Sequence, residues 1–351
     1  MNQIVSITSK KKIGDGHPSF VIAEAGSNHN GSLRRAVKLI DIVADAGADA
    51  VKFQTFKADK LYVKTAGQSR YLKLNESIYG VIKEMEMPRT WIPKLARYCE
   101  KKKIIFLSSP FDQEAVDLLD PYVPAFKIAS YEMTDHPLVE YIAKKGKPLL
   151  MSTGTADLKE VSEAVEVIRR AGNQNLILMQ CTAKYPAPLD SLNLKTIITM
   201  KEKFQLPVGL SDHSQEWNIA PLAAVALGAN CLEKHFTISR RFKGPDHRFS
   251  IEPKELRNMV QMIRLIEQTL GDGIKKTLKV EKELHRFARR SIFAIKDLRP
   301  GEKFTSENVS ILRCGNQKGY LHPRDYSKLL KSIATRKIRA NMPIKYSYFA
   351  S

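Results

Sequence analysis

The chain has 351 residues, enough to bury at least one large hydrophobic core, so one or two domains are expected. Its longest largely apolar stretch, 219–232, is too short to span a bilayer, and we expect no membrane association. The formal net charge is +20, and residues 271–351 hold 19 Lys and Arg against 7 Asp and Glu. Such a basic segment can attract nucleic acid. Because neither a ribonucleoprotein motif nor a zinc-finger pattern is present, we expect no nucleic-acid partner and interpret the charge as a solvated surface.

The N-terminal segment MNQIVSITSKKK lacks the apolar core of a signal peptide. The four cysteines are scattered and form no C-x-x-C pair; they are Cys99, Cys181, Cys231 and Cys314. This usage argues against structural zinc and against a disulfide framework. We therefore expect a cytoplasmic protein.

Short apolar runs of strand length recur along the first 232 residues and alternate with segments that have the 3.6-residue spacing of helices. In one such segment, Leu33, Val37, Ile40 and Ala44 form a stripe that ends at Gly47, a helix stop signal. Repeated alternation of buried-type strands and helices predicts an α/β fold, a (β/α)8 TIM barrel. In chain order the predicted strands are 20–23, 50–53, 104–107, 125–129, 148–151, 176–179, 206–210 and 230–232.

The pattern changes after about residue 272, where a Gly-Asp-Gly turn ends the last helical segment. A polar, basic stretch follows, and then short strand-like pieces separated by turn signals. We predict a barrel domain over 1–272, a linker over 273–286 and a small, mostly β domain over 287–351. A domain of about 60 residues has a marginal core alone. Packing against a barrel, its own or a partner's, would stabilise it.

Polar side chains follow each predicted strand, at the end of a TIM barrel where active sites lie. Lys52 and Lys127 end apolar runs, where a lysine must reach a polar pocket. Serines beside lysines suit an oxyanion such as phosphate or carboxylate, although any single serine could instead cap a helix. Because all eight strands supply such groups, a shared site is favoured. The groups are Glu24; Lys52 and Gln54; Ser108 and Ser109; Lys127 and Ser130; Ser152 and Thr153; Gln180, Cys181 and Tyr185; Ser211, Asp212 and His213; and Glu233, Lys234 and His235.

His213 and His235 end two apolar runs, LPVGLSDH (206–213) and NCLEKHF (230–236), which a helix-like stretch separates. Adjacent parallel strands would place the two imidazoles side by side. Paired imidazoles in a polar pocket bind divalent metal well, whereas a single buried histidine is more often structural. The pair therefore predicts a metal site.

A series of ordered motifs runs through the chain. They are IAEAGSNHNG (22–31), VKFQT (51–55), KIAS (127–130), STG (152–154), CTAKYPAP (181–188), GLSDHS (209–214), EKHFT (233–237) and GPDHRFS (244–250). With these motifs the sequence resembles the sialic acid synthase family, whose members are N-acetylneuraminate and other nonulosonate synthases. The tail, from Phe287 through Arg313 to about Lys345, is similar to the family's C-terminal antifreeze-like (SAF) domain.

The resemblance implies an enzyme that condenses phosphoenolpyruvate with an open-chain N-acetylated hexosamine and releases phosphate. It implies that a divalent metal, manganese with magnesium or cobalt as alternatives, is held by His213 and His235. Glu24 would activate the attacking water as general base, or would only pair with a strand-end lysine. Phosphoenolpyruvate would contact Lys52, Ser109, Lys127, Ser130, Ser152 and Ser211. The sugar would contact Gln54, Tyr185 and Asp246, together with Phe287 and Arg313 from the SAF domain of the other subunit in a domain-swapped homodimer.

The default sugar is N-acetylmannosamine, which gives N-acetylneuraminate, because GPDH at 244–247 is similar to the sialic-type pattern. Diacetamido 6-deoxy hexoses, which lead to legionaminic- or pseudaminic-type acids, are alternatives. A metal-dependent pyruvate aldolase, with Lys52 or Lys127 as a Schiff-base lysine, is a second enzyme hypothesis. A binding module built on the basic C-terminal domain is a non-enzyme hypothesis.

Three places depart from the family pattern. Ala183 stands where relatives often carry Asn or Ser, so we expect one hydrogen bond to phosphoenolpyruvate to be missing or supplied by a neighbour. Cys314 follows Arg313 where Pro is common, which predicts a less rigid turn. The segment 60–87 matches poorly, and we expect it to contribute to sugar specificity, with Asn75 as a candidate.

Overall fold

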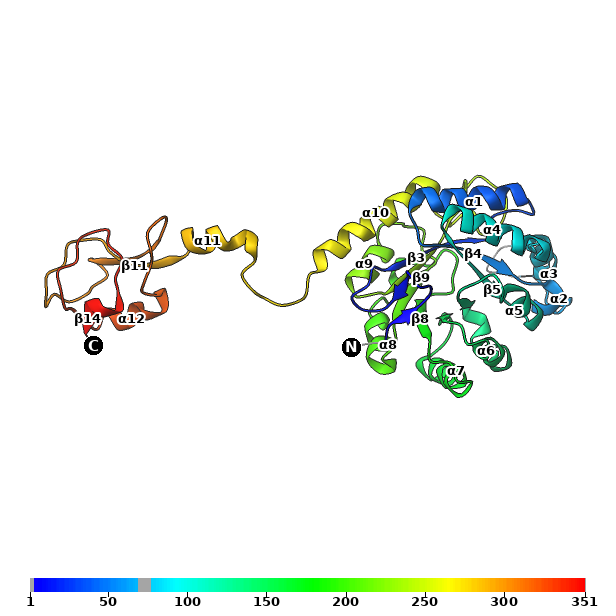
Figure 1. The fold of residues 1–351 in the computed structure, drawn as a ribbon, viewed down its shortest axis with the longest axis horizontal. Helices are drawn as coiled ribbons and strands as arrows, with labels where there is room; N and C mark the ends of the chain where they lie inside the picture. Colours follow the sequence, from blue (N-terminus) through cyan, green and yellow to red (C-terminus); the bar gives the residue numbers. More distant parts are fainter. Residues whose placement is uncertain (1–2, 69–76, 351) are drawn as a thin grey trace. The chain divides into compact units, whose positions relative to one another are not determined.

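The computed structural model describes residues 3–68 and 77–350, so Asn75 lies outside the described residues. The chain divides into two compact units, Met1–Gly271 and Asp272–Ser351 (Figure 1). The stretch 273–286, predicted as a linker, belongs to the second unit and includes a 3-10 helix, η4 (Lys279–Glu281), and most of helix α11 (Lys282–Phe287).

Eight parallel strands form one sheet in the first unit, in the order β5-β4-β3-β10-β9-β8-β7-β6. The two ends of this order, β5 and β6, also pack against each other. The predicted (β/α)8 barrel is therefore confirmed. The strands are β3 (Phe20–Gly26), β4 (Ala50–Thr55), β5 (Ile105–Pro110), β6 (Phe126–Ile128), β7 (Leu149–Ser152), β8 (Leu176–Cys181), β9 (Val208–Asp212) and β10 (Cys231–His235).

Helices surround these strands (Figure 1), and most of them bury an apolar face in the main hydrophobic core. Helix α1 begins after Ser32, whose hydroxyl accepts the N–H of Arg35, and ends at Gly47 in the left-handed conformation. Among the described residues, no helix combines the length and apolar character needed to cross a bilayer. The helices are α1 (Leu33–Ala46), α2 (Ala58–Leu61), α3 (Ile78–Met85), α4 (Ile92–Lys102), α5 (Gln113–Leu119), α6 (His136–Ala143), α7 (Leu158–Arg170), α8 (Thr196–Phe204), α9 (Ala220–Ala226) and α10 (Pro253–Leu270). The 3-10 helices of this unit are η1 (Arg89–Trp91), η2 (Ser130–Glu132) and η3 (Leu189–Ser191).

A short hairpin, β1 (Val5–Ser6) with β2 (Lys12–Ile13), covers the N-terminal end of the barrel. Val5 and Ile13 are fully buried in a core cluster that includes Phe20 and Ile177 from the barrel strands. This cluster fills the barrel end opposite to the predicted site. The sequence interpretation did not include the hairpin.

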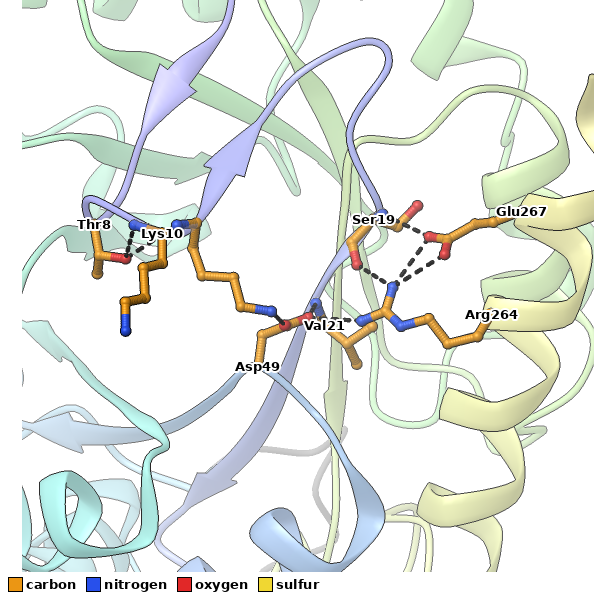
Figure 2. A network of polar contacts seen from close by, with 8 residues as sticks. Thr8, Lys10, Ser19, Val21, Asp49, Arg264 and Glu267 are labelled. Carbon is orange, nitrogen blue, oxygen red and sulfur yellow. Dashed lines mark hydrogen bonds and ion pairs between the residues drawn. The ribbon is translucent and has the colours of Figure 1, made fainter. Parts of the chain in front are cut away.

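A polar network lies at the same end (Figure 2). Asp49, which precedes β4, accepts the N–H of Val21 at 2.9 Å and the guanidinium of Arg264 at 2.8 Å, and it pairs with Lys11 of the hairpin. Arg264, on α10, also donates to the carbonyl oxygen of Ser19 at 2.8 Å. These contacts join the hairpin, two strands and the last helix of the barrel.

The second unit contains two small antiparallel pairs of strands. Strand β11 (Arg290–Ala294) pairs with β12 (Val309–Arg313), and β13 (Ile333–Ala334) pairs with β14 (Phe349–Ala350). Its remaining elements are η5 (Pro323–Asp325), α12 (Tyr326–Leu329) and η6 (Tyr346–Tyr348). A separate hydrophobic core includes Ile292, Leu298, Phe304, Val309, Leu329, Ile338 and Ile344.

Candidate active site

The polar side chains expected at the strand ends lie at the C-terminal end of the barrel. Several strands are longer than predicted and continue into polar residues, as β5 does through Ser108 and Ser109. Backbone pairing continues there: Gln54 of β4 is the register partner of Ser109. Many of the polar residues are thus fixed on strands, whereas Ser130 lies in η2 and His213 directly follows β9. Those that are buried include Glu24, Lys52, Ser108, Ser109, Lys127, Ser130, Ser152, Ser211, His213, Glu233 and His235.

A cluster of four charges occupies the centre of this end. The Nζ atom of Lys52 lies 2.8 Å from Oε2 of Glu24 and 3.5 Å from Oε1 of Glu233. The Nζ atom of Lys127 lies 3.4 Å from the same Oε1 of Glu233. Two ammonium groups therefore alternate with two carboxylates in a buried site. The pairing of Glu24 with a strand-end lysine, foreseen as a structural alternative, is present.

The two carboxylates of this charge cluster have opposite pKa shifts. Burial raises the pKa of Glu24 to about 7, with attraction to Lys52 opposing the rise and repulsion from Glu233 adding to it. Burial acts on Glu233 in the same direction, but Lys127 and Lys52 outweigh it and hold the pKa of Glu233 below its usual range. Burial also disfavours the charged form of Lys52, yet Glu233 and Glu24 raise its pKa above the ordinary value. Glu24 can therefore exchange a proton near neutral pH while Glu233 stays ionised.

Glu233 is the residue that the sequence interpretation undervalued. It was recognised as a strand-end group but received no role. In the structure one of its oxygens also lies 3.4 Å from the hydroxyl of Ser211, so it contacts Lys52, Lys127 and Ser211 together. The signal was present in EKHF, where a carboxylate ends an apolar run.

The predicted oxyanion-binding serines lie around this charge cluster. Lys52 donates to the hydroxyl of Ser109 at 3.2 Å. The hydroxyl of Ser130 accepts the N–H of Gly154 at 3.1 Å. The hydroxyl of Ser152 is buried and has no hydrogen-bond partner in the protein, so it is free to bind a ligand oxygen. Ala183 packs beside Gly154, where a β-carbon would come within 2.9 Å of the alanine methyl group.

His213 and His235 lie side by side, with ring centroids 5.4 Å apart. Nδ1 of His213 lies 2.9 Å from the carbonyl oxygen of Thr182, and donation to this oxygen leaves Nε2 as the lone-pair nitrogen. Nδ1 of His235 is buried without a hydrogen-bond partner and lies 3.9 Å from a carboxylate oxygen of Asp246. Burial, reinforced by the positive charge of His213, holds the pKa of His235 well below its usual range.

These histidines fit a divalent metal ion that has two protein ligands. Each imidazole has a nitrogen that no protein donor occupies, and neutral imidazole is the form that binds metal. Among the residues that the structure describes, no group of three or more His, Cys, Asp or Glu side chains could hold a metal.

Aromatic rings line the histidine pair on one side. The ring of Tyr185 stacks on His213 at a centroid distance of 4.1 Å and lies 6.0 Å from His235. Phe249, which the sequence interpretation did not single out, lies 5.1 Å from His235 and 5.2 Å from Tyr185. The predicted sugar residue Tyr185 is thus adjacent to both predicted metal ligands.

Gln54 and Asp246, also predicted to contact the sugar, converge with Glu24 around Gly26. Gln54 donates to Glu24 at 2.8 Å. Gly26 has φ +49, and a β-carbon there would lie 3.2 Å from Asp246 and 3.4 Å from Glu24. Burial raises the pKa of Asp246 to about 6. The absence of a side chain at Gly26 lets the three polar groups meet.

Glu132 is a further buried carboxylate near the site. It ends η2, two residues after Ser130, and one of its oxygens has no hydrogen-bond partner. Burial raises its pKa to about 7, with the charge of Lys127 opposing the rise. The sequence interpretation missed it because a glutamate in a polar loop resembles a solvated residue.

Phe287 and Arg313 lie in the second unit, and both are exposed there. Arg313 ends β12 opposite Arg290, and the N–H of Gly315 donates to the carbonyl oxygen of Phe287 at 3.0 Å. The two predicted sugar residues are therefore neighbours within this unit. The turn after Arg313 is held by a hydrogen bond from Cys314 N–H to the carbonyl oxygen of Arg289 at 3.0 Å, although it lacks proline.

Comparison with known proteins identifies the family. The NeuB family model matches residues 39–275, and the SAF domain matches residues 289–350. The chain belongs to the NeuB family. The resemblance seen in the sequence is confirmed over both units, including the C-terminal SAF domain.

Several named relatives of this chain are synthases. It is 42% identical to N,N'-diacetyllegionaminic acid synthase of Campylobacter jejuni, over 93% of this chain and 99% of that protein. It is 36% identical to pseudaminic acid synthase of the same species, over 99% of each chain. It is also 42% identical to spore coat polysaccharide biosynthesis protein SpsE of Bacillus subtilis, over 96% of this chain and 95% of that protein. The chain is an enzyme of this nonulosonic acid synthase family.

A solved structure agrees with this assignment. The crystal structure of N-acetylneuraminic acid synthetase from Leptospira borgpetersenii, in complex with citrate, matches with a TM-score of 0.74 and 35% identity. The match covers 81% of this chain and 95% of that chain. Relatives that share 35–42% sequence identity with this chain are thus named for three different products: legionaminic, pseudaminic and N-acetylneuraminic acid.

Proposed function

We propose that this NeuB-family enzyme condenses phosphoenolpyruvate with the open-chain form of an N-acetylated hexosamine, releasing phosphate and forming a nonulosonic acid. The observation that carries the proposal is the buried charge cluster of Lys52, Glu24, Glu233 and Lys127 beside the unpartnered hydroxyl of Ser152. Buried ammonium groups and hydroxyls in a fixed array suit a ligand that carries both phosphate and carboxylate.

Phosphoenolpyruvate would be bound by lysines and serines from several strands. Lys52 and Ser109 are already in contact, at 3.2 Å, and form one half of the array. Lys127 with Ser130, Ser152 and Ser211, all buried, would form the other half. Because these groups are held on strands, or in η2 for Ser130, they would need little reorganisation when negative charge moves during the reaction.

The reaction forms a carbon–carbon bond and a C2–O bond to water, and it breaks the C2–O bond to phosphate. The methylene carbon of phosphoenolpyruvate attacks the aldehyde carbon of the sugar, the aldehyde oxygen takes up a proton from solvent to become a hydroxyl, and positive charge develops at C2. Water adds to C2, and the resulting tetrahedral intermediate loses phosphate by cleavage of the C2–O bond. Glu24 is suited to accept the proton of this water, because its pKa of about 7 matches a general base that acts near neutral pH.

His213 and His235 would hold a divalent metal ion, with manganese proposed and magnesium or cobalt as alternatives. When bound, such an ion would polarise the aldehyde oxygen and stabilise the negative charge that develops on it. Thr182 fixes the ring of His213 by accepting its Nδ1–H, and Tyr185 packs on the same ring. Both neighbours therefore orient the ligand nitrogen before any substrate binds.

The sugar would be bound by Gln54, Tyr185 and Asp246 of the barrel and by Phe287 and Arg313 of a SAF domain. We propose that the SAF domain comes from the second subunit of a domain-swapped homodimer and that Arg313 holds the N-acetyl group. Support comes from the resemblance to the family and from the adjacent, exposed positions of Phe287 and Arg313.

Three sugars are candidates for the hexosamine. N-acetylmannosamine follows from the GPDH pattern at 244–247. The 2,4-diacetamido-6-deoxy mannose and the corresponding altrose follow from the relatives named as legionaminic and pseudaminic acid synthases. These sugars differ in substituents that a few side chains can discriminate.

The test is phosphate release from phosphoenolpyruvate with manganese and each of the three sugars in parallel. Release with one of them would support the condensation and identify the sugar. A pyruvate aldolase would release no phosphate and would accept pyruvate, and borohydride would then trap a Schiff base on Lys52 or Lys127. That outcome would refute the proposed reaction.

A further inference from the structure

Lys234 lies in a buried network that the proposed reaction does not use. Its side chain is 1% exposed. Its Nζ atom donates to Oδ2 of Asp212 at 2.6 Å, to the carbonyl oxygen of Ser214 at 2.5 Å and to that of Glu216 at 3.1 Å. Asp212 in turn accepts the N–H of Ser214 at 2.8 Å and its hydroxyl at 3.0 Å. We call these residues, Asp212, Ser214, Glu216 and Lys234, the Lys234 network.

The register of β9 and β10 places this network behind the active site. Lys234 is the register partner of Asp212, and Glu233 is that of Ser211. Because side chains alternate along a strand, Ser211 and Glu233 point to one face and Asp212 and Lys234 to the other. The first face is the active site, where Glu233 contacts both lysines.

The Lys234 network includes residues that adjoin both histidines in the chain. Asp212 and Ser214 are the residues on either side of His213, and both are bound by one ammonium group. That ammonium belongs to the residue directly before His235. A single side chain thus connects the carboxylate before one proposed metal ligand and the backbone carbonyl after it to the strand that bears the other ligand.

We propose that Lys234 is a positioning residue, which sets the separation of His213 and His235 through its contacts with Asp212 and Ser214 and thereby sets the affinity for the divalent metal. This inference rests on the metal site of the proposed function. Without the ammonium group, Asp212 stays buried without its cation and two backbone oxygens lose their donor, so the segment that follows β9 relaxes. Loss of a partner that hydrogen-bonds a metal ligand typically weakens metal binding about 10- to 100-fold, and this sets the scale expected for Lys234, which binds the neighbours of His213 in the chain.

The decisive variant is Lys234→Met, which keeps the length of the chain and removes the charge. Full-length, metal-stripped protein is titrated with manganese chloride by calorimetry, without substrates. The expected result is binding that is about 10- to 100-fold weaker than in the wild type. At saturating manganese the turnover number should recover to within a few-fold of the wild-type value, since Lys234 does not face the reacting groups.

The matched control is Arg264→Met, which breaks an ion pair with Asp49 at the opposite end of the same barrel (Figure 2). Arg264 also donates to a backbone oxygen, that of Ser19, so the variant loses the same two kinds of contact. It should lower the melting temperature and leave the manganese affinity unchanged. A general loss of barrel stability would affect both variants alike.

The inference is overturned if Lys234→Met melts earlier but binds manganese within twofold of the wild type. If Lys234→Met does not fold, Asp212→Asn replaces it, because asparagine has the same size and lacks the charge. Unchanged manganese affinity in that variant also overturns the inference. Titration of the wild type and of His213→Ala with manganese separates the two proposals. If the wild type binds no manganese, the metal site itself is refuted. If His213→Ala abolishes manganese binding and Lys234→Met does not affect it, only the positioning role of Lys234 is refuted.

Discussion

Glu233 lies between the two active-site lysines, and its replacement by glutamine removes the negative charge that both of them contact. One oxygen of Glu233 is 3.5 Å from Lys52 and 3.4 Å from Lys127, and all three side chains are buried. At an effective dielectric constant of about 20, each contact has a Coulomb energy of about 5 kcal/mol before desolvation is subtracted. Removal of one partner from a buried ion pair costs about 3–5 kcal/mol net. We expect Glu233→Gln to lose that much unfolding free energy.

The same substitution should change the titration of Glu24. Burial is the main cause of the high pKa of Glu24, and repulsion from Glu233 adds to it. Without this repulsion the pKa of Glu24 falls. If Glu24 is the general base, the acidic limb of the profile of kcat/KM against pH therefore moves to lower pH in Glu233→Gln.

Urea unfolding and the pH profile of kcat/KM measure these two effects. The control is Asp117→Asn, which removes an exposed carboxylate that lies 2.6 Å from Lys145. Exposed ion pairs contribute little to stability, so this variant should unfold close to the wild type. If Glu233→Gln unfolds at the same urea concentration as Asp117→Asn, or if its acidic limb stays in place or moves to higher pH, the electrostatic reasoning is wrong.

Three further variants test other parts of the site. Glu24→Gln should abolish turnover. It should also remove a pH dependence of stability. In the wild type the unfolding free energy falls between pH 4.5 and about 7, because the folded protein retains a proton on Glu24 that the unfolded chain has released. Urea midpoints measured across this pH range check this prediction. Gly154→Ala places a methyl group 2.8 Å from the hydroxyl of Ser130, so KM for phosphoenolpyruvate should rise at least several-fold, and an unchanged KM would exclude Ser130 from that site. Arg313→Ala should reduce activity strongly while the oligomeric state measured by light scattering stays that of the wild type, and near-wild-type kinetics with the sugar would refute a role for this arginine.

Much of the barrel could be predicted because apolar runs and helical spacing reflect burial directly. Which residues of each helix are fully buried could not be predicted. Leu33 and Val37, placed on the predicted stripe of α1, are only partly buried, whereas Leu39 and Val43 are fully buried. Helix α1 packs against α4 and α10 as well as the strands, and this wider face cannot be known before the neighbours are known.

The hairpin of β1 and β2 escaped prediction for a different reason. Each of its strands has two residues, too few to produce a periodic pattern. Its burial depends on the open N-terminal end of the barrel, which exists only after the eight strands have assembled. Val5 and Ile13 are buried by that tertiary context.

The site was predictable at the level of strand ends but not at the level of contacts. The rule that barrel enzymes place their chemistry at the C-terminal strand ends brought Glu24, Lys52 and Lys127 into one set. It could not show that Glu233 lies between two lysines, since β4, β6 and β10 are far apart in sequence. The pairing of Lys234 with Asp212 likewise depends on the register of β9 and β10, which one sequence does not specify.

The most direct test of the proposed function is the stoichiometry of phosphate released to sugar consumed, with phosphoenolpyruvate and manganese present. The proposed condensation predicts one phosphate for each sugar and no release when the sugar is omitted. The buried charge cluster and the histidine pair both predict that Glu24→Gln and His235→Ala lose this release while remaining folded. Phosphate release that does not require the sugar, or sugar consumption without phosphate release, would contradict the proposed function.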